Sequence, residues 1–335
     1  MLFLLLMPCL LQRVGRAQVL SDEVIGYYDA TWVNCNTWRQ FDLMMHIESV
    51  ADTGRQEIFT ETSVLRYVVD FDDGKFFVAG MSTYSSSLHA PGGKVEAVKF
   101  SGLVSNGAAS RKFVFPSKPH SFTGSALVGL SSLQIPDPRC VGLAKFPVLF
   151  YPDPADPGFE RIVASGQLLN PAQTNVLSDG TVEFEVFRPF TTKTRFGTCV
   201  TKYQYSLDSL MPKRHSATLA IESAGMRKSF PQFAEVYEWR KLKNIFVPER
   251  ILQDSVGFYD APKGLVGTQE IKDGERFNLQ TTVTFHWFSL NDVVDDTRFA
   301  LSSIDNVAEV RRLLDPALSN AESIKSLGNN STRQN

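Results

Sequence analysis

The chain has 335 residues, of which 43% are hydrophobic and 21% are charged, and its formal net charge is −2 at pH 7. This composition is typical of a globular protein and excludes a chain that is disordered throughout. The near-neutral charge gives no broad electrostatic attraction to nucleic acid or to an anionic membrane surface, while 25 Phe residues supply large rings for sheets to cover.

The chain begins with an apolar run from Met1 to Leu11, too short to span a bilayer, followed by Gly15-Arg16-Ala17. Small residues at the third and first positions before Gln18 suit signal peptidase. The sequence therefore predicts a signal peptide over residues 1–17, cleaved after Ala17, and a secreted or periplasmic location. No Lys or Arg precedes the apolar run, so an uncleaved apolar N-terminus is the alternative interpretation.

Helix signals follow at three places. Ser21-Asp22-Glu23 provides a cap and first-turn acids for an amphipathic helix whose apolar residues are four apart, at Val24, Tyr28 and Trp32. A second candidate helix runs from Phe159 to Leu169. A third has Asp305 as its cap and must end before Pro316. Residues 319–335 are polar and lack aromatic side chains, so we expect a disordered tail there.

Strand signals dominate the rest of the chain. The run "TVEFEVFRPF" alternates apolar residues with two Glu, and "TTVTFHWFSL" does the same around Val283. The run "TSVLRYVVDFDDGKFFVAGM" predicts a hairpin across Asp72-Asp73-Gly74, where the Gly supplies the positive φ of a tight turn. Because a period of two leaves one face of each strand wet, the pattern favours an antiparallel sheet over a parallel sheet buried on both faces.

Two segments late in the chain, "DSLMPKRHSATL" (Asp208–Leu219) and "EWRKLKNIFVPERI" (Glu238–Ile251), resemble hairpins of the outer-membrane lipoprotein carrier (LolA/LolB-like) superfamily. Lys243-Asn244 makes the turn of the second hairpin. Pro248 lacks an N–H and must lie at a strand start, a bulge or an edge. The stretches "DPRCVGL" and "HWFSLNDVVDDTRF" are similar to large uncharacterised secreted bacterial proteins of the same shape.

This resemblance implies an α+β fold, mainly an antiparallel β half-barrel curled around a few helices, with a concave face that can enclose acyl chains. We expect one such domain over residues 18–318. The region at about 82–147, rich in Gly, Ser and Pro, is expected to form an insertion of long loops over the scaffold, with short strands in it. Whether this region forms a separate lobe is left open.

The sequence contains few catalytic or metal-binding patterns. The five His residues are far apart, and no H-x-x-x-H, G-x-S-x-G, Walker or G-x-G-x-x-G motif is present. The clusters "DFDD", "YPDPADPGFE" and "NDVVDDTRF" suit either calcium or turns, and turns explain them better. We therefore predict no catalytic residue, no metal and no cofactor. Three cysteines follow the signal peptide, none in a C-x-x-C spacing, so at most one disulfide forms among Cys35, Cys140 and Cys199.

Several strands carry apolar side chains on both faces, and the second face must be covered by helices, by another sheet or by a ligand. Four aromatic residues are candidates for lining a ligand site, with core packing as the alternative: Tyr237, Trp239, Phe285 and Trp287. The favoured function is a non-enzymatic protein outside the cytoplasm that binds or carries a lipid or another hydrophobic molecule. The alternative is a structural or protein-interaction module of the cell envelope with a filled half-barrel. An enzyme is a third hypothesis without a motif to support it.

Overall fold

The computed structural model describes residues 22–54, 57–86, 95–150, 168–169, 175–191, 196–223, 226–258 and 276–314. The predicted signal peptide, the predicted tail and most of the predicted helix at 159–169 lie outside these residues. The last two residues of that predicted helix are described, and they form a two-residue strand, β7 (Leu168–Leu169).

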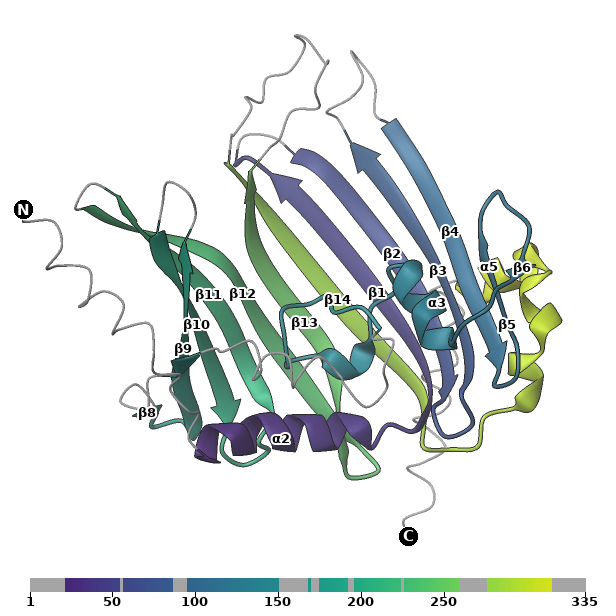
Figure 1. Cartoon of the computed structure of the whole chain (residues 1–335), viewed down its shortest axis with the longest axis horizontal. Helices are drawn as coiled ribbons and strands as arrows, with labels where there is room; N and C mark the ends of the chain where they lie inside the picture. The colour runs from purple at the N-terminus through teal and green to yellow at the C-terminus, as the bar shows by residue number, and fades with distance from the viewer. Residues whose placement is uncertain are drawn as a thin grey trace, which may run out of the picture.

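The described residues form one 14-stranded sheet in which every pairing is antiparallel (Figure 1). The sheet is not closed, and three α-helices accompany it in the described part, so the predicted α+β half-barrel is confirmed. Besides β7, its strands are β1 (Gln40–Asp52), β2 (Glu57–Asp70), β3 (Lys75–Ser86), β4 (Val95–Asn106), β5 (Ser110–Val114), β6 (His120–Ser121), β8 (Asn175–Val176), β9 (Thr181–Thr191), β10 (Phe196–Ser206), β11 (Pro212–Ser223), β12 (Met226–Leu242), β13 (Ile245–Phe258) and β14 (Arg276–Leu290).

The strand order is β6-β5-β4-β3-β2-β1-β14-β13-β12-β11-β10-β9-β7, with β8 also paired to β9. Most neighbours in the sheet are therefore neighbours in the chain. One exception lies at the edge, where β7 pairs with β9, and the other lies at the centre, where β1 pairs with β14 and Phe41 lies opposite Leu290. This pairing joins a meander formed early in the chain to a meander formed late.

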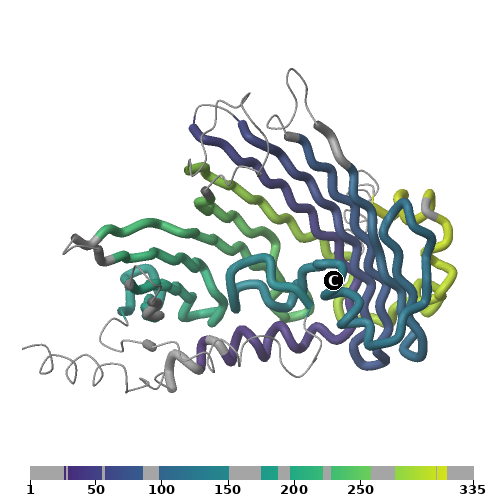
Figure 2. Tube along the Cα trace, turned by 45° about the horizontal axis from the view of Figure 1, so that its top comes forward, coloured from purple at the N-terminus to yellow at the C-terminus, as the bar shows by residue number. Residues whose placement is uncertain are grey.

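One face of the sheet, called here the inner face, carries a plug formed by residues 126–150. The plug contains helix α3 (Ala126–Ser132) and the 3-10 turn η1 (Pro138–Cys140). Figure 2 shows this teal segment in front of the strands, with helix α2 (Asp22–Asn36) along the lower rim. The helix predicted from Ser21 onward is thus confirmed. The described portion of the region at 82–147 contributes strands β4, β5 and β6 and most of the plug.

The main core lies between the lower half of the inner face and the plug. Burial of these apolar surfaces contributes about 25 cal/mol per Å². The sheet contributes aromatic and branched side chains. The plug, α2 and the connection from α2 to β1 supply Cys35, Trp38, Ala126, Leu127, Leu130, Leu133, Ile135, Val141, Phe146 and Phe150.

The outer face of β1 to β5 carries a second core under the C-terminal elements η3 (Asp296–Phe299), η4 (Leu301–Ile304) and α5 (Val307–Leu313). The helix predicted near the C-terminus is present, but the prediction of Asp305 as its cap is wrong. Asn306 accepts a hydrogen bond from Glu309 N, while Asp305 pairs with Arg111 at 2.8 Å. The Asp305 carboxylate, one residue before the cap, instead forms an ion pair with the guanidinium of Arg111 on β5.

The hairpin of β12 and β13 confirms the prediction made for "EWRKLKNIFVPERI". Lys243 and Asn244 both have positive φ, +49° and +66°, as a two-residue turn requires. Pro248 lies opposite Trp239 next to a register shift that leaves Glu249 without a partner in β12. Because Pro has no N–H to pair, this bulge is where the strand tolerates it.

Inward and outward alternation on β9 also follows the prediction. Val182, Phe184 and Val186 are buried in a third cluster with Tyr203 and Tyr205 of β10, and Tyr27 of α2 packs on it. The outward Glu183 and Glu185 instead contact the ammonium of Lys202 at 2.9 and 3.2 Å. The predicted hairpin of β2 and β3 is confirmed as well, with φ of +64° at Gly74.

Candidate ligand-binding site

A row of polar side chains crosses the inner face above the main core, with one residue from each of six neighbouring strands. Strand register places each residue opposite the next, from β11 through β12, β13, β14 and β1 to β2. This polar row consists of His215, Glu235, Gln253, Thr281, Ser49 and Glu61. Cross-strand hydrogen bonds within it join Gln253 Nε2 to Glu235 Oε1 at 2.6 Å and Ser49 Oγ to Thr281 Oγ1 at 3.0 Å.

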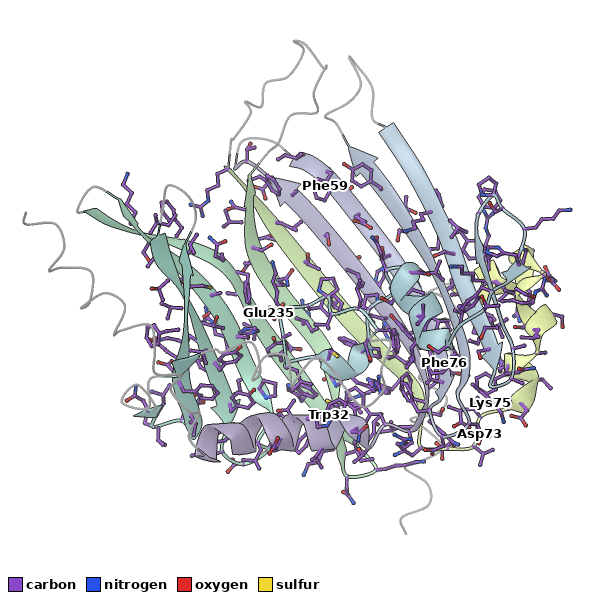
Figure 3. The ribbon with its side chains drawn as sticks, viewed as in Figure 1. Trp32, Phe59, Asp73, Lys75, Phe76 and Glu235 are labelled. Carbon is purple, nitrogen blue, oxygen red and sulfur yellow. The ribbon has the colours of Figure 1, made fainter. Side chains whose placement is uncertain are left out.

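One end of the polar row is buried and holds the plug. Glu235 is fully buried, and its carboxylate accepts hydrogen bonds from Phe146 N at 2.7 Å and from the Tyr237 hydroxyl at 2.5 Å. His215 Nδ1 lies 3.4 Å from the same carboxylate, and the His215 ring stacks on Tyr203 with 4.4 Å between centroids. Figure 3 labels Glu235 about halfway along β12, behind the plug. A buried carboxylate is costly unless it is satisfied in this way.

Two phenols also act as fixed donors around the plug. Burial, with the nearby Glu235 carboxylate as a further cause, raises the pKa of Tyr237 well above its ordinary value. Burial likewise raises the pKa of Tyr67, whose hydroxyl donates to the Pro136 carbonyl at 3.0 Å. Both phenols therefore stay protonated and remain donors.

The other end of the polar row opens into a pocket of about 320 Å³ between the plug and the upper inner face. Its volume is at the lower end of the range of roughly 300–1,000 Å³ found for small-molecule sites. The lining joins apolar residues of sheet and plug to a band of hydroxyl groups. It comprises Ile47, Ser49, Glu61, Ser63, Leu65, Gly80, Ser82, Lys99, Ser101, Leu133, Gln134, Ile135, Pro136, Phe146, Pro147, Gln253, Leu279 and Thr281.

The four aromatic residues predicted to line a ligand site lie on the inner face but below this pocket. Tyr237, Phe285 and Trp287 are 5%, 2% and 3% exposed, and Trp239 is half-buried. All four belong to the main core or pack against it. Trp239 donates to the Pro212 carbonyl at 2.7 Å and Trp287 to the Pro248 carbonyl at 2.9 Å. That a ligand reaches any of them remains a prediction.

The residues that line the pocket were not among those predicted from the sequence. One signal was available in β14, where the inward series Phe285, Val283 continues into Thr281 and so changes from apolar to polar. The same change from Leu65 to Ser63 occurs on β2. That these positions meet in one row depends on the register of strands far apart in the sequence.

The acidic clusters act as turns and caps wherever the structure describes them. Asp70 Oδ1 accepts from the backbone N of Asp72 and Asp73 at 3.0 and 3.1 Å, and Asp295 caps η3. The backbone and side chain of Thr297 lower the pKa of Asp295. No group of three or more His, Cys, Asp or Glu suited to a metal occurs among the described residues, and "YPDPADPGFE" lies outside them.

The three described cysteines lie in different environments. Cys35 of α2 and Cys140 of the plug are buried, whereas Cys199 of β10 is half-buried. Burial raises the pKa of both Cys35 and Cys140, so their thiols stay protonated and behave as small apolar groups.

Within the described ranges, no helix has the length and apolar character needed to cross a membrane. No family model and no curated protein matches the sequence. Among solved structures, the chain is similar to a DUF1329 family protein from Desulfovibrio piger, at 12% identity and a TM-score of 0.35 over 85% of this chain and 100% of that chain.

It is also similar to a LolA superfamily protein from Nitrosomonas europaea, at 8% identity and a TM-score of 0.32 over 82% of this chain and 98% of that chain. A domain described as an outer membrane lipoprotein-sorting protein from Vibrio parahaemolyticus matches at 7% identity and a TM-score of 0.35, over 83% of this chain and 98% of that one. The LolA superfamily that the sequence resembles is thus represented among these structures. Identities and TM-scores this low carry no argument about function.

Proposed function

We propose that the protein is a non-enzymatic binding protein that acts outside the cytoplasm and holds the apolar chain of a lipid or another amphiphile in the pocket above the plug. The observation that supports the proposal is the pocket itself, a space of about 320 Å³ between the sheet and the plug. The apolar N-terminal run with its cleavage pattern supports export.

The apolar part of the pocket wall comes from both sheet and plug. Ile47, Leu65 and Leu279 project from β1, β2 and β14, and Leu133 and Ile135 face them from the plug. An alkyl chain that enters between these two walls loses its contact with water on both sides. Burial of its apolar surface, at about 25 cal/mol per Å², provides affinity without any catalytic group. The pocket size suits a single chain.

The proposal of a non-catalytic role is supported by the state of the His–carboxylate pair in the polar row. His215 and Glu235 are 3% and 0% exposed, and the Glu235 carboxylate accepts hydrogen bonds from the plug and from Gln253. A general base must reach the proton that it abstracts, and this pair is shielded from any substrate in the pocket.

Filling the pocket tests this function. Gly80 lines it from β3, and a Cβ there would lie 3.3 Å from Leu65 Cδ2, so the Leu65 side chain must shift by a few tenths of an ångström to admit it. We expect Gly80→Leu to abolish binding of a fluorescent decanoic acid probe. The matched control is Gly26→Leu on α2, where a new Cβ meets nothing within 4 Å and binding should be unchanged. Equal binding by the two variants would remove the pocket as the site.

The plug itself supports a second candidate, a structural or protein-interaction module of the envelope. Residues 126–150 already fill the lower half of the inner face with the protein's own side chains. If native mass spectrometry finds no bound lipid and the decanoic acid probe does not bind, this candidate is favoured. Cross-linking in an envelope extract would then identify a partner protein, and the Gly80→Leu variant would still bind that partner.

A further inference from the structure

We propose that the polar end of the ligand is zwitterionic, with an anionic group next to the apolar chain and a cationic amine beyond it. This inference rests on the proposed function, because it names the head group of the amphiphile that the pocket holds. The pocket has two charged residues in its lining, Glu61 of β2 and Lys99 of β4. Among the described residues no ion pair within 4.0 Å involves either one, and Glu61 has only a 3.4 Å contact from Ser63 Oγ.

The two charges stand apart on the inner face, with β3 between their strands. Two strand spacings separate them by about 10 Å across the sheet. Register also sets them on different rows, because Glu61 lies opposite Tyr84 whereas Lys99 lies opposite Ser82, which is opposite Ser63. A ligand that carries two opposite charges can therefore meet both residues at once.

The position of each row along the strands sets the order of charges in the ligand. The row of Lys99 and Ser63 lies next to the apolar row of Leu65, which faces the plug. On β2 itself, Glu61 lies one step farther along the strand from Leu65 than Ser63 does. A chain buried against the plug thus reaches Lys99 first and Glu61 second, so the anion precedes the cation.

An aromatic pair next to Glu61 completes a site for an amine. Phe59 lies on the same face of β2 two residues before Glu61, and its ring is 5.5 Å from that of Tyr84, centroid to centroid. Figure 3 shows Phe59 at the upper end of the strand, at the rim. A carboxylate beside aromatic faces is an arrangement that attracts alkylated ammonium groups. The hydroxyls of Ser63 and Ser82, 2.6 Å apart, lie between this site and Lys99 and can bond phosphate oxygens.

Decyl amphiphiles with one chain and different heads test the proposal by calorimetry below their micelle concentrations. The series is decylphosphocholine, decyl sulfobetaine with the reverse charge order, decyl phosphate, decyltrimethylammonium and decyl maltoside. We expect decylphosphocholine to bind tightest. Its affinity should be about tenfold higher than that of decyl phosphate or decyltrimethylammonium, which each keep one charged contact, and about a hundredfold higher than that of decyl maltoside, which keeps neither, since each charged contact is worth roughly tenfold. The sulfobetaine should also bind at least tenfold more weakly, because its charges are in the reverse order.

Two variants assign the charges. Glu61→Gln should lower the affinity for decylphosphocholine and decyltrimethylammonium about tenfold and leave the affinity for decyl phosphate unchanged. Lys99→Met should lower the affinity for decylphosphocholine and decyl phosphate alone. Glu48→Gln on the outer face and Lys118→Met in the exposed turn after β5 are matched controls that should change nothing.

The outcomes separate this proposal from the proposed function. Equal affinity for all five amphiphiles, still lost in Gly80→Leu, would overturn the zwitterionic head while the binding function stands. A preference for the sulfobetaine, or one that survives Glu61→Gln, would also overturn it. If none of the five binds, the function fails and this inference fails with it.

Discussion

The peptide unit of Phe146 is clamped by two side chains from neighbouring strands. Gln253 Nε2 donates to the Phe146 carbonyl at 2.8 Å, and Glu235 Oε1 accepts from Phe146 N at 2.7 Å. Gln253 also donates to Glu235, which fixes both side chains relative to each other. The plug is thus attached to the sheet by hydrogen bonds as well as by apolar contact.

Removing Glu235 should release this clamp. Glu235→Ala leaves Phe146 N, the Tyr237 hydroxyl and His215 buried with their partner gone. We expect a loss of about 3–5 kcal/mol in the free energy of unfolding, measured by urea denaturation. The Phe146 amide should also exchange its hydrogen faster. Glu48→Ala, at a side chain 60% exposed on β1, is the control and should stay within about 0.5 kcal/mol of the parent. A cost under about 1 kcal/mol for Glu235→Ala would contradict the role of the clamp.

The buried ion pair of the plug should show strong coupling. Arg139 donates to Asp137 at 3.1 and 2.7 Å, both residues are under 5% exposed, and the guanidinium stacks 3.9 Å from the Phe71 ring centre. Each single variant, Asp137→Ala or Arg139→Ala, leaves one buried charge without its partner. Each should lower the free energy of unfolding by about 3–5 kcal/mol.

A double-mutant cycle measures that coupling. Asp137→Ala combined with Arg139→Ala should destabilise by less than the sum of the single changes, with an interaction energy of about 1–3 kcal/mol. Additive costs would mean that the two side chains act independently.

Stability should fall on the alkaline side. Burial raises the pKa of Cys35, Cys140, Tyr67 and Tyr237 in the folded protein. In the unfolded chain these groups ionise at ordinary values, so the folded state binds more protons at high pH. Stability is therefore fully present below the unfolded pKa values and declines as pH rises above about 8.5 for the thiols and about 10 for the phenols.

Urea midpoints measured from neutral pH to about pH 10 check this slope, and Cys35→Ala should make it shallower. A midpoint that is constant with pH would refute the prediction.

In the native protein a thiol reagent should modify the half-buried Cys199 before the two buried cysteines.

Asn34 should contribute more to the stability of the fold than its position near a helix end suggests. Its amide donates to the Phe246 carbonyl at 2.7 Å and accepts from Phe246 N at 3.0 Å, which ties α2 to the start of β13. Asn34→Ala should lower the free energy of unfolding by about 1–3 kcal/mol, because it leaves two backbone groups unpaired. Asn36→Ala, at the exposed last residue of the same helix, is the control. Similar denaturation midpoints for the two variants would rule out this anchor.

Strands were predictable because each carries its own periodic signal. Alternation identified β9 and β14, and Gly74 identified the turn of β2 and β3. Pro248 restricted its own position to a strand start, a bulge or an edge, and it lies at a bulge. These features depend on neighbours in sequence, which a single chain displays directly.

The plug and the pocket were not predictable in the same way. The segment around "SSLQIPDPRCVGL" has the Gly, Ser and Pro content of a surface loop, and its burial is decided by the sheet that it packs on. The polar row requires Ser49 and Thr281 to face each other, 232 residues apart. No local pattern encodes that register.

The pairing of β1 with β14 has a consequence for biogenesis. Until the chain has been made or translocated as far as Leu290, strand β1 and strand β13 each present an open row of backbone donors and acceptors at what will become the middle of the sheet. Such edges recruit other chains. A truncated chain that ends before Arg276 should therefore aggregate rather than persist as a smaller stable protein. During export, the unpaired edges of β1 and β13 would need to be covered until β14 pairs with them.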